Sequence, residues 1–222
     1  MRRAALVYNP SSGTRREQRV ADVEAAARAL REAGIVAEMV ATRGPGTASE
    51  QAREAIAGGC DAVFACGGDG TLHEAMQGVL ASGSEAVLGI IPLGTGNALA
   101  NDLGIPLRQS ALAARLLAAG ATRRIAVAKI EYQQRDGSSA SRYFTVMAGV
   151  GPDAYLLYSM NLAAKGKFGM GAYYAQAAKL VLTHDFPEFE VEFTDAPTGE
   201  RRIQRAAGIM AVRIAYFGGA LR

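Results

Sequence analysis

The first 120 residues alternate short apolar runs with segments of helical periodicity, and this alternation restricts the fold more than any other feature. The predicted strands span residues 4–8, 36–42, 61–66 and 86–91. The predicted helices span residues 16–33, 47–57 and 71–81. The first helix carries Val20, Val23, Ala27 and Leu30 at helical spacing, and the other two open with Thr-x-x-Glu, the capping-box pattern. Strand and helix in strict alternation predict an α/β domain with a parallel sheet and right-handed crossovers.

The second half of the chain differs in composition. Residues 1–122 hold 11 basic and 12 acidic residues, whereas residues 123–222 hold 13 and 9 and also 13 of the 15 aromatic residues. Alternating runs at 123–132 and 142–149 surround Asp136-Gly137, and runs at 189–195 and 208–217 surround Thr198-Gly199; both dipeptides favour turns. We therefore predict two domains, 1–122 and 123–222, the second an antiparallel β-sandwich with a helical insert at about 153–183.

Several classes of protein are excluded or disfavoured. No run approaches the roughly 18 apolar residues of a membrane-spanning helix, and the apolar run before Asn9 is too short for a signal peptide, so we expect a cytoplasmic protein whose membrane contact, if any, is peripheral. Cys60 and Cys66 match no zinc spacing and are interpreted as buried thiols. The basic residues neither cluster densely nor accompany a nucleic-acid motif, so no nucleic-acid partner is expected.

Three loops rich in Gly, Ser or Thr follow predicted strands: Asn9–Gly13, Gly67–Thr71 and Pro92–Asn97. In a parallel sheet they lie at the carboxyl edge, where the free N–H groups of helix N-termini can hold an anion. Each loop alone can be a simple turn, and Thr71 with Glu74 can be only a capping box. Asp69 lies between two glycines, where a carboxylate can hold a metal bound to phosphates.

Neither standard nucleotide fingerprint fits. The P-loop pattern is absent. Gly149–Ala154 fits G-x-G-x-x-A, but the next acidic residue after it is Asp185, which argues against a dinucleotide site.

In order and spacing, "NPSSG", Thr42, "GGDGTLHEAMQGV" and "PLGTGNALANDLGIP" resemble the catalytic domain of the diacylglycerol kinase and sphingosine kinase family, especially its bacterial soluble lipid kinases. The resemblance continues through "AGVGPDAY", "KGKFGMGAYYAQAAKL" and "YFGGALR". It implies that ATP binds with Mg²⁺ between the two domains and that the γ-phosphoryl group passes to a lipid hydroxyl.

The resemblance also implies the site residues. For the nucleotide these are Asn9, Pro10, Ser11, Ser12, Gly13, Thr42, Gly67, Gly68, Asp69, Gly70, Thr71, Glu74, Gly94, Thr95 and Asn97. Asp69 is implied as the metal ligand and the acidic residue of catalysis, while the catalytic base of the family would lie beyond Arg222.

The sequence departs from the family at three positions. Ala98 and Ala126 replace carboxylates found in many relatives, and Arg213 stands where an Asn is usual. The chain also ends before the Pro-x-Ala and Asp-Gly-Leu segments of the family, so we expect an incomplete copy whose sandwich lacks strands. The hypothesis is nucleotide binding with little or no turnover. The alternatives are an inactive nucleotide- or lipid-binding module and an NAD kinase-like enzyme, against which "NPSSG" and "PLGTGN" argue.

The lipid acceptor stays open. Six aromatic residues between positions 153 and 186 lie near Lys165, Lys167 and Lys179, a combination that suits an acyl chain at an anionic membrane surface but that helix packing explains as well. Diacylglycerol, a sphingoid base and a phosphatidylglycerol-like lipid are the candidates. The oligomeric state is also open, with a homodimer as one option.

Overall fold

The computed structural model describes residues 1–11, 16–152, 154–155, 179, 183 and 185–214. It divides into two compact units, Met1–Val146 with Arg213–Arg222, and Met147–Val212. These units are not the domains predicted above, whose boundary between residues 122 and 123 remains a prediction.

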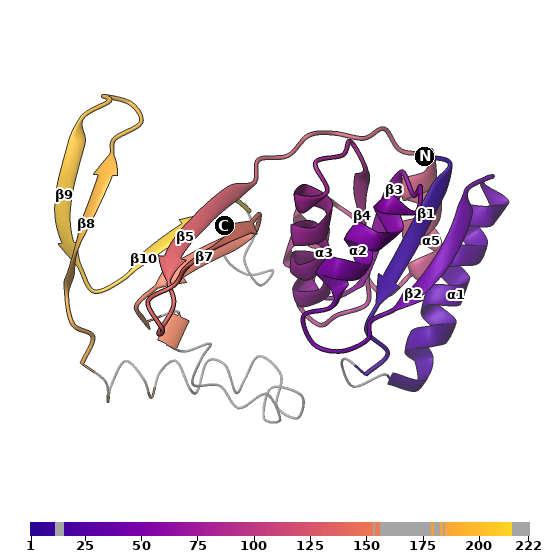
Figure 1. The fold of residues 1–222 in the computed structure, drawn as a ribbon, viewed down its shortest axis with the longest axis horizontal. Helices are drawn as coiled ribbons and strands as arrows, with labels where there is room; N and C mark the ends of the chain where they lie inside the picture. Colours follow the sequence, from indigo (N-terminus) through magenta and orange to yellow (C-terminus); the bar gives the residue numbers. More distant parts are fainter. Residues whose placement is uncertain (12–15, 153, 156–178, 180–182, 184, 215–222) are drawn as a thin grey trace. The chain divides into compact units, whose positions relative to one another are not determined.

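A four-stranded parallel sheet forms the centre of the first unit (Figure 1). Its strands are β1 (Arg3–Tyr8), β2 (Val36–Ala41), β3 (Ala62–Gly67) and β4 (Val87–Pro92), in the order β2-β1-β3-β4. All three pairings are parallel, which confirms the predicted α/β class. Every residue of β3 is buried, because helices cover both faces of the sheet.

Two helices pack on each face of the sheet. Leu6 and Phe64 pack with α1 (Arg16–Glu32) and α5 (Ser110–Ala119) on one face. Val7 and Val63 pack with α2 (Ala48–Ala57) and α3 (Asp69–Ala81) on the other. Successive strand residues thus alternate between two apolar clusters, as the period of a strand requires.

The inner face of α1 is rotated from its predicted position. Val20 is 39% exposed, whereas Arg19 is 4% exposed and lies one helical turn before the buried Val23. The periodicity of α1 was therefore right but its first predicted core residue was wrong. Arg19 is tolerated inside because its Nη1 donates to the carbonyl of Leu93 at 2.8 Å.

Neither predicted capping box forms. Thr47 and Gly68 are the N-caps of α2 and α3, and neither end has a side-chain capping bond. The Thr47 hydroxyl instead donates to the Gly44 carbonyl at 2.9 Å, and Thr71 lies inside α3. At Thr47 a local hydrogen bond replaces the capping geometry, and at Thr71 the helix has already begun two residues earlier.

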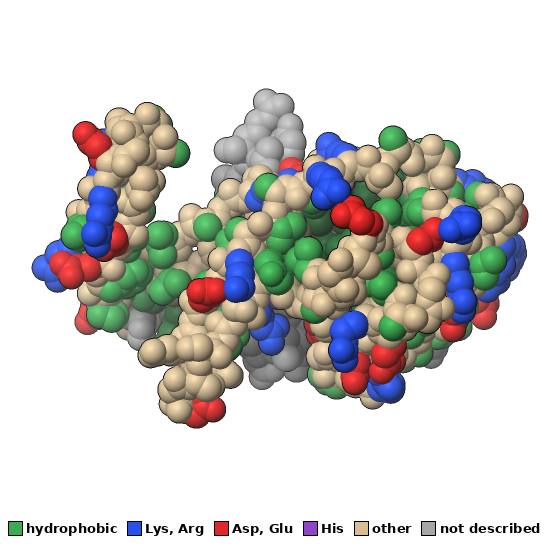
Figure 2. Space-filling view, turned by 45° about the horizontal axis from the view of Figure 1, so that its top comes forward, with side chains coloured by type: hydrophobic (Ala, Val, Ile, Leu, Met, Phe, Trp, Pro, Cys, Tyr) green, Lys and Arg blue, Asp and Glu red, His purple; other side chains and the backbone are tan. Residues whose placement is uncertain are grey.

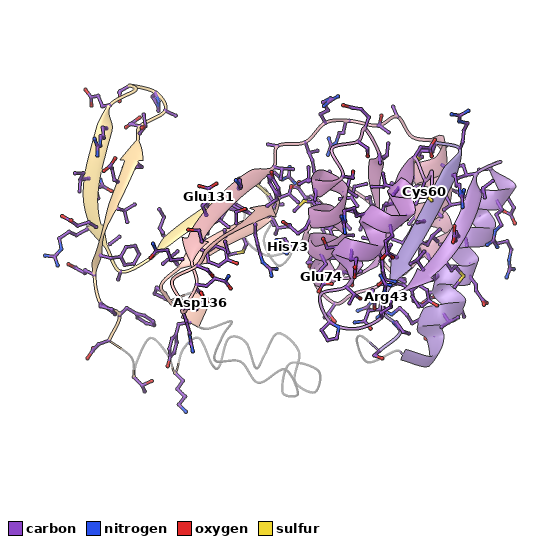
Figure 3. All side chains as sticks on the ribbon, viewed as in Figure 1. Arg43, Cys60, His73, Glu74, Glu131 and Asp136 are labelled. Carbon is purple, nitrogen blue, oxygen red and sulfur yellow. The ribbon has the colours of Figure 1, made fainter. Side chains whose placement is uncertain are left out.

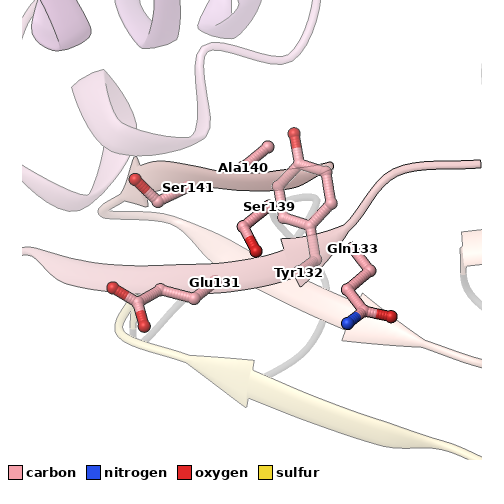
Figure 4. A pocket seen from close by; sticks show the side chains of 6 residues that line it. All are labelled: Glu131, Tyr132, Gln133, Ser139, Ala140 and Ser141. Atoms are coloured by element: carbon pink, nitrogen blue, oxygen red, sulfur yellow. The ribbon is translucent and has the colours of Figure 1, made fainter. Parts of the chain in front are cut away.

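A hairpin completes the described part of the first unit. β5 (Ala128–Gln133) pairs antiparallel with β6 (Ser139–Phe144) around Gly137, whose φ of +83° suits the predicted Asp-Gly turn. The hairpin binds α3, since the Gln77 amide donates to the Tyr143 carbonyl at 2.8 Å and accepts from the Tyr143 N–H at 2.9 Å. An open hollow on the hairpin is lined by Glu131, Tyr132, Gln133, Ser139, Ala140 and Ser141 (Figure 4), none of which is a predicted site residue.

The second unit consists of antiparallel pairs. β7 (Met147–Val150) pairs with β10 (Ile209–Val212), and β8 (Phe189–Thr194) pairs with β9 (Arg201–Ala206). The run at 142–149, predicted as one strand, contributes to both β6 and β7. The predicted helical insert lies almost entirely outside the described residues, as do Lys165 and Lys167; within it, Tyr155 packs edge-on against Phe186 at 6.2 Å between ring centroids.

Charged side chains of both signs are interspersed on the surface shown in Figure 2. Arg201 pairs with Glu192 at 2.5 Å and Arg202 with Asp195 at 3.0 Å along the β8–β9 pair. Within the described residues, no helix has the length and apolar character that crossing a membrane demands.

Candidate nucleotide-binding site

The carboxyl edge of the parallel sheet gathers the predicted loops. Asn9 follows β1, Thr42 follows β2, Gly68 follows β3 and Leu93 follows β4. The Thr42 N–H donates to the Tyr8 carbonyl at 2.8 Å, so the ends of β1 and β2 are joined directly. The parallel topology therefore brings segments from four parts of the sequence to one edge, as expected of such sheets.

The loops after β3 and β4 touch through their main chains. The N–H groups of Leu93 and Gly94 donate to the Gly67 carbonyl at 2.9 and 3.2 Å. A Cβ on Gly94 would collide with the Cα of Gly68, and one on Gly68 would lie 3.3 Å from the Cα of Gly94. Gly94 thus requires glycine because of close approach rather than backbone conformation, and Gly68 leaves little room for a Cβ.

Asn97 shapes the loop after β4. Its backbone is left-handed, with φ +49°, and its side chain is 3% exposed. Its Oδ1 accepts from the Gly94 N–H at 3.1 Å, and its Nδ2 donates to the Gly94 carbonyl at 2.8 Å. The Asn97 amide is used to fold the loop, and Thr95 and Gly96 remain exposed at its tip.

The N-terminus of α3 faces this loop. Gly68 is extended, at φ −96° and ψ −170°, and the helix begins at Asp69. The Asp69 carboxylate lies against Gly96, because a Cβ built on Gly96 would be 3.2 Å from Oδ2. The Thr71 hydroxyl turns back toward Gly67. An acidic first residue is favourable at the positive end of a helix, and the first-turn amides have no side-chain cap.

The remaining predicted residues lie in the loop after β1 and in α3. Asn9 accepts the Ser11 N–H on Oδ1 at 2.9 Å, a local turn that leaves Ser11 exposed beside Pro10. Glu74 lies in the second turn of α3, half-buried (Figure 3). Ser12 and Gly13 lie outside the described residues.

Two buried groups lie under this edge: Arg19, whose burial was not predicted from the sequence, and Cys66, whose predicted burial is confirmed. Arg19 reaches the Leu93 carbonyl from α1, and Cys66 lies fully buried in the last part of β3. Burial raises the pKa of the Cys66 thiol, while the nearby Arg19 opposes that rise. The sequence did hold a signal for the burial of Arg19, because this residue lies one helical turn before the apolar residues on the inner face of α1.

The acidic content of this edge is low. Among the residues that the structure describes, no three His, Cys, Asp or Glu side chains gather as a metal site would require. Asp102, in the short helix α4 (Ala98–Asp102), is bound by Arg213 at 2.7 Å. Asp69 is therefore the acidic side chain best placed at the junction of the two glycine loops.

Comparison with known proteins identifies the family. The family model described as the diacylglycerol kinase catalytic domain matches residues 3–130. The chain belongs to this family. The matched range contains the whole parallel sheet and every loop described above.

Individual relatives agree with this assignment. A diacylglycerol kinase of Bacillus subtilis strain 168 is 32% identical over 193 residues, which are 87% of this chain and 60% of that protein. A diacylglycerol kinase of Staphylococcus epidermidis is 28% identical over 87% of this chain and 58% of its own length. A crystal structure of a diacylglycerol kinase from Bacillus anthracis strain Sterne has a TM-score of 0.65 at 25% identity, covering 98% of this chain and 66% of that one. The chain thus spans about 60% of the length of the curated relatives.

Proposed function

We propose that this chain binds ATP with Mg²⁺ at the carboxyl edge of its parallel sheet and belongs to a lipid kinase. The observation that carries the proposal is the close approach of Gly68 and Gly94. It brings the first turn of α3, which begins with Asp69, next to the exposed tip of the β4–α4 loop. Glycine at both contact points lets main-chain amides approach a phosphate closely. Membership of the diacylglycerol kinase family supports the same assignment.

The chemistry required of such a site is positioning and charge neutralisation. Phosphoryl transfer needs little covalent work from the protein, so amides, hydroxyls and one carboxylate suffice to hold the triphosphate. Asp69 would hold Mg²⁺, which when bound neutralises charge on the phosphates. Around it, Asn9, Thr42, Thr71 and Thr95 would contact the nucleotide, and Asn97 would keep Gly94 in place.

The acceptor is proposed from the relatives. The curated proteins it matches are named diacylglycerol kinase, so a lipid hydroxyl, that of diacylglycerol or a related lipid, is the acceptor we propose. Such a substrate would bring the protein to a membrane surface from the cytoplasm.

A second candidate is nucleotide binding without transfer. Two features favour it: Ala98 and Ala126 stand where the family resemblance implies carboxylates, and Asp102 is bound by Arg213. Mg²⁺ would then have Asp69 as its acidic ligand and would bind through the phosphates.

The test compares binding with transfer. Titration calorimetry with ATP, with and without Mg²⁺, measures affinity, and labelled ATP with diacylglycerol in mixed micelles measures transfer. We expect Mg²⁺-dependent ATP binding that Asp69→Asn weakens about tenfold, or ~1.4 kcal/mol, because the metal loses its carboxylate. Glu85→Gln is the control, since Glu85 pairs with Arg124 on the open surface.

The outcomes separate the candidates. Binding with transfer supports the kinase, and binding without transfer supports the second candidate. Binding of NAD in place of ATP would support an NAD kinase-like enzyme and overturn both.

A further inference from the structure

Gln51 is a buried polar residue next to the loop that carries Thr42. It lies on the inner face of α2 with Ala48 and Ala52, and 5% of it is exposed. A buried amide without hydrogen bonds destabilises the fold, so the partners of Gln51 indicate why it is tolerated.

Both ends of the Gln51 amide bind the β2–α2 loop. Nε2 donates to the Ala41 carbonyl at 2.6 Å. Oε1 accepts from the Arg43 N–H at 3.2 Å and lies 3.0 Å from the Thr47 hydroxyl, whose single proton is within reach of both Oε1 and the Gly44 carbonyl. The two main-chain partners are the residues immediately before and after Thr42, so one side chain holds both of its peptide neighbours.

The rest of the loop extends this arrangement. The Thr47 hydroxyl also accepts from the Arg43 and Gly44 N–H groups at 3.1 and 3.2 Å. The Arg43 side chain binds Glu54 at 2.8 Å on the surface, turned toward α2. Thr42 itself is fastened to β1 through its N–H. The main chain at Thr42 is therefore fixed on both sides before any ligand arrives.

We propose that Gln51 is a positioning residue of the nucleotide site, which fixes the peptides flanking Thr42 so that Thr42 meets the nucleotide in a preformed geometry. This rests on the proposed function. Preorganisation lowers the entropy that binding must overcome, so loss of the Gln51 amide should weaken the nucleotide complex through Thr42 and not through a contact of its own.

A purely structural role for Gln51 makes a different prediction. If its bonds only stabilise the packing of α2, removing them lowers stability but leaves the affinity of the folded protein unchanged. Gln77 provides the matched control, because its amide also binds main chain from a helix, but at Tyr143 in the β5–β6 hairpin.

The experiment measures Mg-ATP affinity for Gln51→Leu, Gln51→Glu, Gln77→Leu and Thr42→Ala in the full chain. We expect Gln51→Leu to weaken binding about tenfold and Gln77→Leu less than about twofold, although both lower the unfolding temperature. Gln51→Glu keeps the acceptor oxygen that faces the Arg43 N–H but places a second oxygen, in the position of Nε2, against the Ala41 carbonyl, so its loss of affinity should be intermediate.

A double-mutant cycle decides whether the effect passes through Thr42. In the Gln51→Leu background, Thr42→Ala should change affinity by less than about twofold, because both substitutions remove the same contact between Thr42 and the nucleotide. Amide exchange should be faster at residues 42–44 of Gln51→Leu and unchanged at residues 93–97.

Each failure has its own signature. Normal affinity in Gln51→Leu, or additive losses in the cycle, would overturn the positioning role while leaving the proposed function intact. Absence of Mg-ATP binding by the unaltered chain would overturn the proposed function itself, and the inference with it. Should Gln51→Leu fail to fold, the isosteric Gln51→Glu, which keeps the acceptor oxygen for the Arg43 N–H, provides the same comparison.

Discussion

Asp61 shows how a single side chain ties down the start of the chain. Its Oδ1 accepts from the N–H groups of Arg2 and Arg3 at 2.9 and 3.0 Å, just before β1, and Oδ2 accepts from the N–H of Arg2 at 2.8 Å. Burial acts to raise the pKa of Asp61, but these main-chain bonds, together with the positive charges of the N-terminus and Arg2, outweigh it, and the net pKa is lowered.

The lowered pKa gives a prediction for stability against pH. A carboxylate with a depressed folded pKa contributes fully above its unfolded value, about 3.9, and loses that contribution as the pH falls through the folded pKa. We expect Asp61→Asn to lower the free energy of unfolding by about 1 kcal/mol at pH 7, a value discounted for partial exposure, and by progressively less below pH ~4. Urea titrations at several pH values measure this, with Glu85→Gln as control. A difference that grew on acidification would contradict the assignment.

Among the site residues, the sequence indicated which residue types could bind a ligand better than it indicated which hydrogen bonds each side chain forms. Asp69 and the glycines at 68 and 94 could be named because their residue types and loop positions restrict what they can do. The roles of Asn97, Arg19 and Gln51 could not be predicted, since their residue types do not reveal which carbonyl or N–H their polar atoms reach after folding. Contacts between residues distant in sequence decide these roles.

At the scale of elements, α2 and α3 pack closely because Gly78 has no side chain. A Cβ on Gly78 would collide with the Ser49 carbonyl oxygen and lie 3.0 Å from the Cβ of Ala52. Gly78→Ala should therefore lower stability by about 2 kcal/mol, although alanine favours a helix. Gly70→Ala in the same helix meets nothing within 4 Å and should raise stability by up to about 1 kcal/mol. Thermal unfolding of the two variants gives opposite signs if α3 packs as described, and equal signs if it does not.

The boundaries of the strands could be predicted from the local hydrophobic pattern where the same residues also form the packed core. β1 to β4 begin and end within one residue of their predicted limits. β9 was missed, because Arg201, Arg202 and Arg205 interrupt its apolar alternation and its stability comes from pairing with β8. The capping boxes failed for a related reason: a threonine hydroxyl has several neighbouring partners, and local sequence does not rank them.

For the whole molecule, alternation of strand and helix was enough to predict a parallel sheet and loops on one edge. The order β2-β1-β3-β4 was not predicted, although it decides that Thr42 and Gly94 lie at opposite ends of the row of loops. That order depends on which apolar faces fit together across the sheet, a property of packed side chains.

The position of the site on the whole chain gives the last prediction. If ATP binds at the carboxyl edge, Mg-ATP should slow amide exchange at residues 9–11, 42–44, 67–71 and 93–97, because these segments form that edge. The opposite edge supplies the internal control, since the loops at residues 33–35, 58–61 and 82–86 enter the same strands from the other side. At a ligand concentration 100 times the dissociation constant, global unfolding also becomes less favourable by about 2.7 kcal/mol. This slows exchange at every amide that exchanges only through global unfolding. The informative measurement is therefore the excess protection of the carboxyl-edge loops over the control loops. Equal protection at both edges would indicate general stabilisation without a site at this edge, and greater protection at the control loops would place the nucleotide elsewhere.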